Sequence, residues 1–128
     1  MKLVVAGSRG FDNLGLLSES VSDFHWEIMQ GEPRMDLVFK EVVSGGARGA
    51  DQLGEQYAAM HNIPVTKMIP DWDGLGKRAG MVRNAEMAEY ADAVIVFWDG
   101  ESKGTKQMID CTKRKGKYLK VVLYNEEG

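Results

Sequence analysis

The chain has 128 residues, of which 44% are hydrophobic and 27% are charged, and its formal net charge is −3. This length suits a single domain over residues 1–128, the composition is that of a globular protein, and an acidic balance disfavours holding nucleic acid by a general positive field. No apolar run approaches the roughly 20 residues that span a bilayer, and the first apolar run is too short for a signal peptide, so we expect a cytoplasmic protein.

Five segments have the branched aliphatic composition of strands. Four of them are expected to be buried on both faces, and the segment at 64–70 is the weakest of the five. The predicted strands are residues 3–7, 41–45, 64–70, 93–98 and 118–124.

Helical spacing fills the gaps between these strands. In the second helical segment Leu53, Tyr57 and Met60 form a stripe that is expected to face a sheet. The stretch 30–39 gives no clear element, because Gly31 and Pro33 stop a helix there. The predicted helices are residues 14–30, 50–61, 77–90 and 104–115.

This alternation of strand and helix predicts an α/β, Rossmann-like domain with a mainly parallel five-stranded sheet and helices on both faces. The expected strand order is 3-2-1-4-5. Such an order leaves a crevice between strands 1 and 4 at their carboxyl ends, where ligands bind in sheets of this kind.

A glycine-rich turn follows each of the first four strands. The turns are "GSRG" at 7–10, "SGGARGAD" at 44–51, "DWDGLGKRAG" at 71–80 and "WDGESKGT" at 98–105. In a parallel sheet all four emerge at one edge, and the helices that begin near Gly49 and Gly104 would point the positive ends of their dipoles there. The pattern predicts an anion site for phosphate or pyrophosphate.

Two common phosphate-binding motifs do not fit. The turn at 44–51 lacks the lysine of a Walker A loop, and the turn at 7–10 lacks the glycine spacing of the dinucleotide fingerprint. No acidic residue ends the second strand to hold a ribose. A P-loop hydrolase and an ordinary dehydrogenase are therefore disfavoured.

The four turns with their flanking residues resemble the YspA-type, cpYpsA-related branch of the SLOG superfamily, through "GSRGF", "VSGGARGAD.LGE", "DW...GKRAG..RN..M" and "FWDG.SKGT..MI". Relatives include the Lonely Guy phosphoribohydrolases, the DNA-processing A proteins and sensor domains for signalling nucleotides related to ADP-ribose. The resemblance implies a nucleotide-type ligand in the crevice. Met108 stands where Lonely Guy enzymes have a glutamate, whereas Arg83 matches an arginine of their other motif.

The candidate ligand-binding residues come from the turns and the helix starts that follow them. Each also has a structural reading: salt bridges for the arginines, helix capping for Asp51, turn and N-cap chemistry for Asp99, Ser102 and Thr105, and packing for the tryptophans. The candidates are Gly7, Ser8, Arg9, Ser44, Gly45, Gly46, Arg48, Gly49, Asp51, Trp72, Lys77, Arg83, Asn84, Trp98, Asp99, Gly100, Ser102, Gly104 and Thr105.

Three functions follow from these residues. The first is a non-catalytic or weakly catalytic binder of an AMP-, ADP-ribose- or NAD-like ligand, acting as a sensor or a sequestering protein. The second is an N-glycoside hydrolase that uses Glu55, Asp51 or Asp99 as acid or base. The third, single-stranded DNA binding, is disfavoured by the acidic charge.

Cofactors and partners are expected to be few. The two histidines and the single cysteine have no ligand spacing, so we expect no metal site of the protein's own, and magnesium would enter only with a phosphate ligand. Superfamily relatives often pair through helices, so the resemblance implies a homodimer. We expect no membrane partner.

Overall fold

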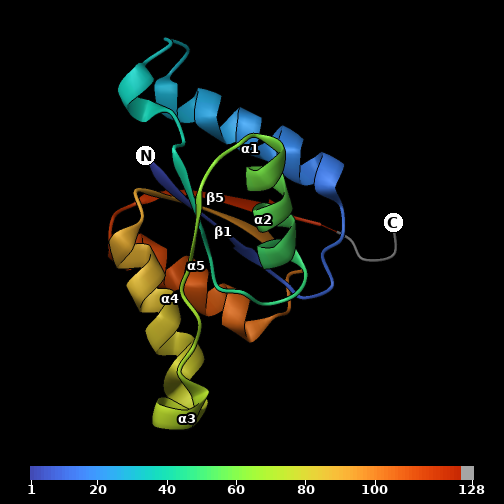
Figure 1. The fold of residues 1–128 in the computed structure, drawn as a ribbon, viewed down its shortest axis with the longest axis vertical. Coiled ribbons are helices and arrows are strands. Elements are labelled where there is room, and N and C mark those ends of the chain that lie inside the picture. The colour runs from blue at the N-terminus through green and yellow to red at the C-terminus, as the bar shows by residue number, and fades with distance from the viewer. Residues whose placement is uncertain (125–128) are drawn as a thin grey trace.

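The computed structural model of the protein describes residues 1–124. Its five strands form one parallel sheet in the order β3-β2-β1-β4-β5, which confirms the predicted Rossmann-like α/β fold (Figure 1). The strands are β1 (Lys2–Gly7), β2 (Glu41–Ser44), β3 (Val65–Lys67), β4 (Ala93–Trp98) and β5 (Tyr118–Leu123). The helices are α1 (Leu14–Met29), α2 (Ala50–Met60), α3 (Trp72–Leu75), α4 (Ala79–Tyr90) and α5 (Lys103–Arg114), with 3-10 turns at Met35–Leu37 and Gly76–Arg78.

Strand β1 lies at the centre of the sheet. Leu3 pairs with Val42 of β2 on one side and with Ala93 of β4 on the other. Because β1 has a strand on each side and helices above and below it, its residues 3–6 are all buried, as the continuous apolar run predicts. The chain reverses direction across this strand, so β1 and β4 flank the crevice.

Helices cover both faces of the sheet, with α1 and α2 on one face and α4 and α5 on the other (Figure 1). Alternate residues of β1 supply the two cores: Leu3 and Val5 pack toward α1 and α2, whereas Val4 and Ala6 pack toward α4 and α5. Each face of the sheet is therefore buried by side chains from different helices.

Helix α1 forms for the expected reason. Its buried residues Leu17, Val21, Phe24 and Ile28 recur every three or four positions and make one apolar stripe. The helix ends at Gln30, which adopts a left-handed conformation. The unassigned stretch that follows holds a 3-10 turn, and β2 begins at Glu41.

The edges of the sheet differ from the prediction. Strand β3 has three residues rather than seven, and β5 is half-exposed rather than buried on both faces, because each has a neighbouring strand on one side only. The predicted helix at 77–90 begins at Ala79, after the short helix α3 and a 3-10 turn that the sequence did not indicate.

The prediction that Leu53, Tyr57 and Met60 of α2 face the sheet is wrong in part. Met60 is exposed, whereas the residues of α2 that are buried are small or polar: Ala50, Asp51, Gly54 and Ala58. A methyl group at Gly54 would lie 2.7 Å from Cβ of Val5, so α2 rests directly on β1 through its small residues.

No helix within residues 1–124 has the length and apolarity that a membrane crossing requires.

Candidate functional site

A cavity of about 780 Å³ opens at the carboxyl edge of the sheet, between the end of β1 and the amino-terminal halves of α4 and α5. All four glycine-rich turns contribute residues to its wall. Twelve of the candidate residues line it: Gly7, Ser8, Arg9, Asp51, Trp72, Lys77, Arg83, Asn84, Asp99, Ser102, Gly104 and Thr105.

The floor of the cavity is apolar. It is made by Ala6 of β1, Met87 of α4 and Met108 of α5, and all three residues are buried. Met108 therefore lines the cavity at the position where the Lonely Guy enzymes have a glutamate. The floor offers contact surface for a flat or apolar part of a ligand but no acid at that point.

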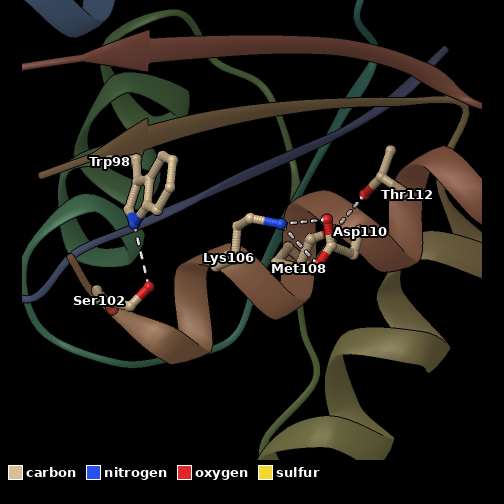
Figure 2. A network of polar contacts seen from close by, with 6 residues as sticks. All are labelled: Trp98, Ser102, Lys106, Met108, Asp110 and Thr112. Atoms are coloured by element: carbon tan, nitrogen blue, oxygen red, sulfur yellow. Dashed lines mark hydrogen bonds and ion pairs between the residues drawn. The ribbon is translucent and has the colours of Figure 1, made fainter. Parts of the chain in front are cut away.

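Three cationic side chains stand on the rim of the cavity. Arg9, Lys77 and Lys103 come from three separate turns, and all are exposed. Within residues 1–124 none of the three has an ion-pair partner. Lys106, one helical turn beyond Lys103, instead holds both oxygens of Asp110 at 2.8 and 2.9 Å and does not line the cavity (Figure 2). The rim thus carries three positive charges that no ion pair within the described residues engages.

The first turn of α5 also faces the cavity. Ser102 is the N-cap, and its hydroxyl oxygen accepts a hydrogen bond from the hydroxyl of Thr105 at 3.0 Å. The amides of Lys103 and Gly104 have no partner within the described residues, as is usual in the first turn of a helix. Free amide donors and the positive end of the helix dipole favour an anion here.

Asp99 builds the turn that leads into α5. One of its oxygens accepts the amides of Glu101 and Ser102 at 2.9 and 2.8 Å, and the two hydrogen bonds lower the pKa of Asp99. Asp99 and Ser102 therefore have the structural roles in the turn and at the N-cap that the sequence suggests. Asp99 is also one of the residues that line the cavity.

Asp51 is a buried carboxylate in the cavity wall. Burial raises its pKa to about 6, although the amide of Ala47 donates to it at 3.2 Å and the nearby charge of Arg83 favours the ionised form. Asp51 is the second residue of α2, whose N-cap is Gly49, so it binds back to the preceding turn and is not the cap itself.

Arg83 and Asn84 hold two walls of the cavity from one helix. Arg83 donates to the carbonyl oxygen of Gly45 at 2.8 Å, in the turn after β2. The amide of Asn84 donates to the carbonyl oxygen of Gly104 at 3.4 Å and to the side-chain oxygen of Gln107 at 2.6 Å, both in α5. For Arg83, the hydrogen bond to Gly45 takes the place of the salt bridge that the sequence suggests.

The turn at 44–51 uses its polar groups internally. The hydroxyl of Ser44 accepts the amide of Gly46 at 3.1 Å and donates to Glu55 at 2.6 Å, and Glu55 also pairs with Lys67 at 3.4 Å. Gly49 has a φ of +82° and approaches the carbonyl oxygens of Ser8 and Arg9. Packing and backbone geometry explain the glycines of this turn.

Eight candidate residues lie outside the cavity lining. Trp98 packs against the core on the α4 and α5 face, and its indole N–H donates to the carbonyl oxygen of Ser102 at 3.0 Å (Figure 2). Arg48 is exposed and does not line the cavity. The eight are Ser44, Gly45, Gly46, Arg48, Gly49, Glu55, Trp98 and Gly100.

Several lining residues were absent from the candidates. Four of them lie on the two helices that flank the cavity, where helical periodicity indicates them: Gly80 and Met87 share a face of α4 with the candidate Asn84, and Gln107 and Met108 share a face of α5 with the candidate Gly104. The further residues of the lining are Ala6, Gly10, Ala47, Met81 and Lys103.

The described part of the chain offers no cluster of metal-ligating side chains. Residues 1–124 contain no group of three or more histidine, cysteine or acidic side chains placed to hold an ion.

Comparison with known proteins gives a family. Residues 1–74 match the YspA, cpYpsA-related SLOG family. The chain is also 33% identical over 97 residues to the "Gene 61 protein" of Mycobacterium phage D29, an alignment that covers 71% of this chain and 78% of that protein. No solved structure matches it. On the family match over more than half its length, the chain belongs to the YspA, cpYpsA-related SLOG family.

Proposed function

We propose that this protein binds a phosphorylated, nucleotide-type ligand in the cavity between β1 and β4, as a sensor or a sequestering protein. The observation that carries the proposal is a set of three cations, Arg9, Lys77 and Lys103, that have no ion pair within residues 1–124 and surround one opening, which the first-turn amides of α5 also face without a partner in that range. Phosphate oxygens are the common groups that satisfy both cations and helix amides.

The size and lining of the cavity support the same class of ligand. Small-molecule pockets have volumes of about 300–1,000 Å³ and combine apolar surface with a few polar groups. This cavity has about 780 Å³, a floor of two methionines and an alanine, and polar walls that include Asp51, Arg83 and Gln107. A mononucleotide or an ADP-ribose-like molecule suits such a space.

Isothermal titration tests the proposal with AMP, ADP-ribose, NAD and cyclic ADP-ribose. We expect at least one of them to bind the wild-type protein. Lys103→Ala should weaken that ligand about fivefold to tenfold, since one charge-assisted contact is worth about 1 to 1.5 kcal/mol at an exposed rim. Lys106→Ala is the matched control, because Lys106 pairs with Asp110 one turn away.

Folded wild-type protein that gives no heat with any of the four ligands would overturn the proposal. Equal losses of ligand affinity in Lys103→Ala and Lys106→Ala would show that the anion does not contact Lys103. Chromatography of the ligand recovered after binding separates a sensor, which returns it unchanged, from an enzyme.

N-glycoside hydrolysis is the second candidate, and the position of Asp51 favours it. Release of a base breaks the bond between C1′ and the base nitrogen and adds water at C1′, through a state with positive charge on the sugar. Asp51, one of the two carboxylates in the lining, has a pKa of about 6; ionised, it would stabilise that charge and accept the proton of the water, which then passes to the leaving base. Glu55 is engaged with Ser44 and Lys67.

Liberation of free base from AMP tests this candidate. Hydrolysis by Asp51 predicts that Asp51→Asn abolishes base release, whereas Glu55→Gln keeps it. Release that survives in Asp51→Asn would exclude Asp51 as the catalytic group, and no release by the wild-type protein would leave binding as its function.

A further inference from the structure

Trp72 is an exposed aromatic side chain in the wall of the cavity. It is the first residue of α3, and 53% of its surface is accessible. Its position is fixed by Asp71, which caps α3 by accepting the amide of Gly74 at 2.9 Å. The edge of its ring lies beside Gly80, where an added methyl group would be 3.6 Å from Cη2. The indole therefore rests against the first turn of α4 at the opening.

The other two tryptophans do not reach the cavity. Trp98 is held against the core by its hydrogen bond to Ser102 (Figure 2), and Trp26 lies on α1, on the opposite face of the sheet (Figure 1). The indole N–H of Trp72 has no hydrogen-bond partner within residues 1–124. Trp72 thus keeps much of its ring and its polar group available at the opening.

The surroundings of Trp72 combine two kinds of surface. Met81, 59% exposed, adds apolar surface to the same wall, while Lys77, five residues after Trp72, adds a positive charge. A sugar phosphate would satisfy the cation but leave the ring uncovered. A flat aromatic ring joined to a phosphate would satisfy both, because stacking on an indole removes apolar surface from water on both partners.

We infer that Trp72 is a specificity-determining residue of this site: its indole stacks on the aromatic ring of the ligand and selects phosphates that carry an aromatic ring over sugar phosphates that carry none. This inference rests on the proposed function, since it assigns one wall of the same cavity.

Titration of AMP and of ribose 5-phosphate into the wild-type protein and three variants tests it. In Trp72→Ala we expect AMP to bind about 10-fold to 100-fold more weakly, the range for loss of one base–aromatic stack, and ribose 5-phosphate to bind within twofold of wild type. Trp72→Phe should recover most of the AMP affinity. Trp26→Ala, which removes a tryptophan of similar exposure from the other face, should change neither ligand.

Tryptophan emission gives a second readout. AMP should quench the wild-type protein, and the change should vanish in Trp72→Phe while it persists in Trp26→Phe. Unaltered AMP binding in Trp72→Ala, or equal losses for AMP and ribose 5-phosphate, would overturn the inference and leave the proposed function standing. A folded wild-type protein that binds neither ligand, nor the other nucleotides tested above, would overturn both.

Discussion

Asp51 is a carboxyl group whose burial raises its pKa from 3.8 to about 6. The native protein therefore holds this proton more tightly than the unfolded chain does. The stability that this proton contributes is fully present below about pH 4 and is lost as the pH rises through about 6. The shift corresponds to on the order of 3 kcal/mol.

We expect Asp51→Asn to remove this part of the pH dependence. Urea unfolding of both proteins between pH 4 and pH 7 measures it: the free energy of unfolding of the wild type should fall, relative to that of the variant, as the pH rises across this window. Parallel pH profiles would show that Asp51 titrates normally in the folded protein.

Gly45 lies against the guanidinium of Arg83. A methyl group at this position would overlap Nη1 of Arg83 and lie 2.8 Å from a carboxylate oxygen of Asp51. Gly45→Ala should therefore displace Arg83 from the carbonyl oxygen of Gly45 and destabilise the protein by about 1–3 kcal/mol.

A double-mutant cycle with Arg83→Ala checks the cause by denaturant unfolding. Without the guanidinium the added methyl has more room, so the cost of Gly45→Ala should fall below about 1 kcal/mol in the Arg83→Ala background. Additive costs would locate the strain elsewhere in the turn.

At the scale of elements, α2 depends on the absence of a side chain at Gly54. Alanine normally stabilises a helix by up to about 1 kcal/mol relative to glycine. Here Gly54→Ala should destabilise the protein by about 1–3 kcal/mol, because its methyl meets Val5 of β1. Gly15→Ala in the exposed first turn of α1 is the control and should be neutral or stabilising. Urea midpoints compare the two, and a stabilising Gly54→Ala would show that α2 can shift.

The same helix shows what sequence patterns can and cannot predict. Leu53 and Tyr57 pack against the core, but the contact with the sheet is made by Gly54 and Ala58, which carry no hydrophobic signal of their own. By contrast, the strands β1, β2 and β4 and their order were predictable, because continuous apolar runs separated by helices allow few arrangements. Tertiary contact decides the face of a helix when small residues make the closest approach.

Site residues were predictable to the extent that they sit in turns after strands. Arg9, Lys77 and Asp99 were found in this way and line the cavity. Trp98 and Glu55 lie outside the lining: Trp98 bonds to the carbonyl oxygen of Ser102, and Glu55 bonds to Ser44 and Lys67, contacts that sequence spacing does not encode. Gln107 could have been found from the periodicity of α5.

For the whole molecule, the net charge and the local charge have opposite signs. The chain carries −3 overall, yet four cations and two carboxylates line the cavity. This separation keeps most of the surface unattractive to polyanions while it concentrates positive potential at one opening. Under the proposed function, this distribution favours capture of a small anion over general adhesion to nucleic acid.

A ligand held in this way should stabilise the entire fold. At a concentration 100 times its dissociation constant, a ligand of the native state adds about 2.7 kcal/mol, which for a chain of this size raises Tm by roughly 5–10 °C. Thermal unfolding with AMP should show this rise in the wild type and a smaller one in Lys103→Ala at the same AMP concentration. Identical shifts in the two proteins would argue against a role of Lys103 in binding.

Arg83 and Asn84 are successive residues, yet they bond to segments from opposite halves of the sheet, Gly45 after β2 and Gly104 in α5. Hydrogen bonds from two successive residues therefore connect the two halves across the crevice. A displacement of α4 large enough to release one wall would release the other as well. The position of α4 therefore sets the separation of both walls of the opening.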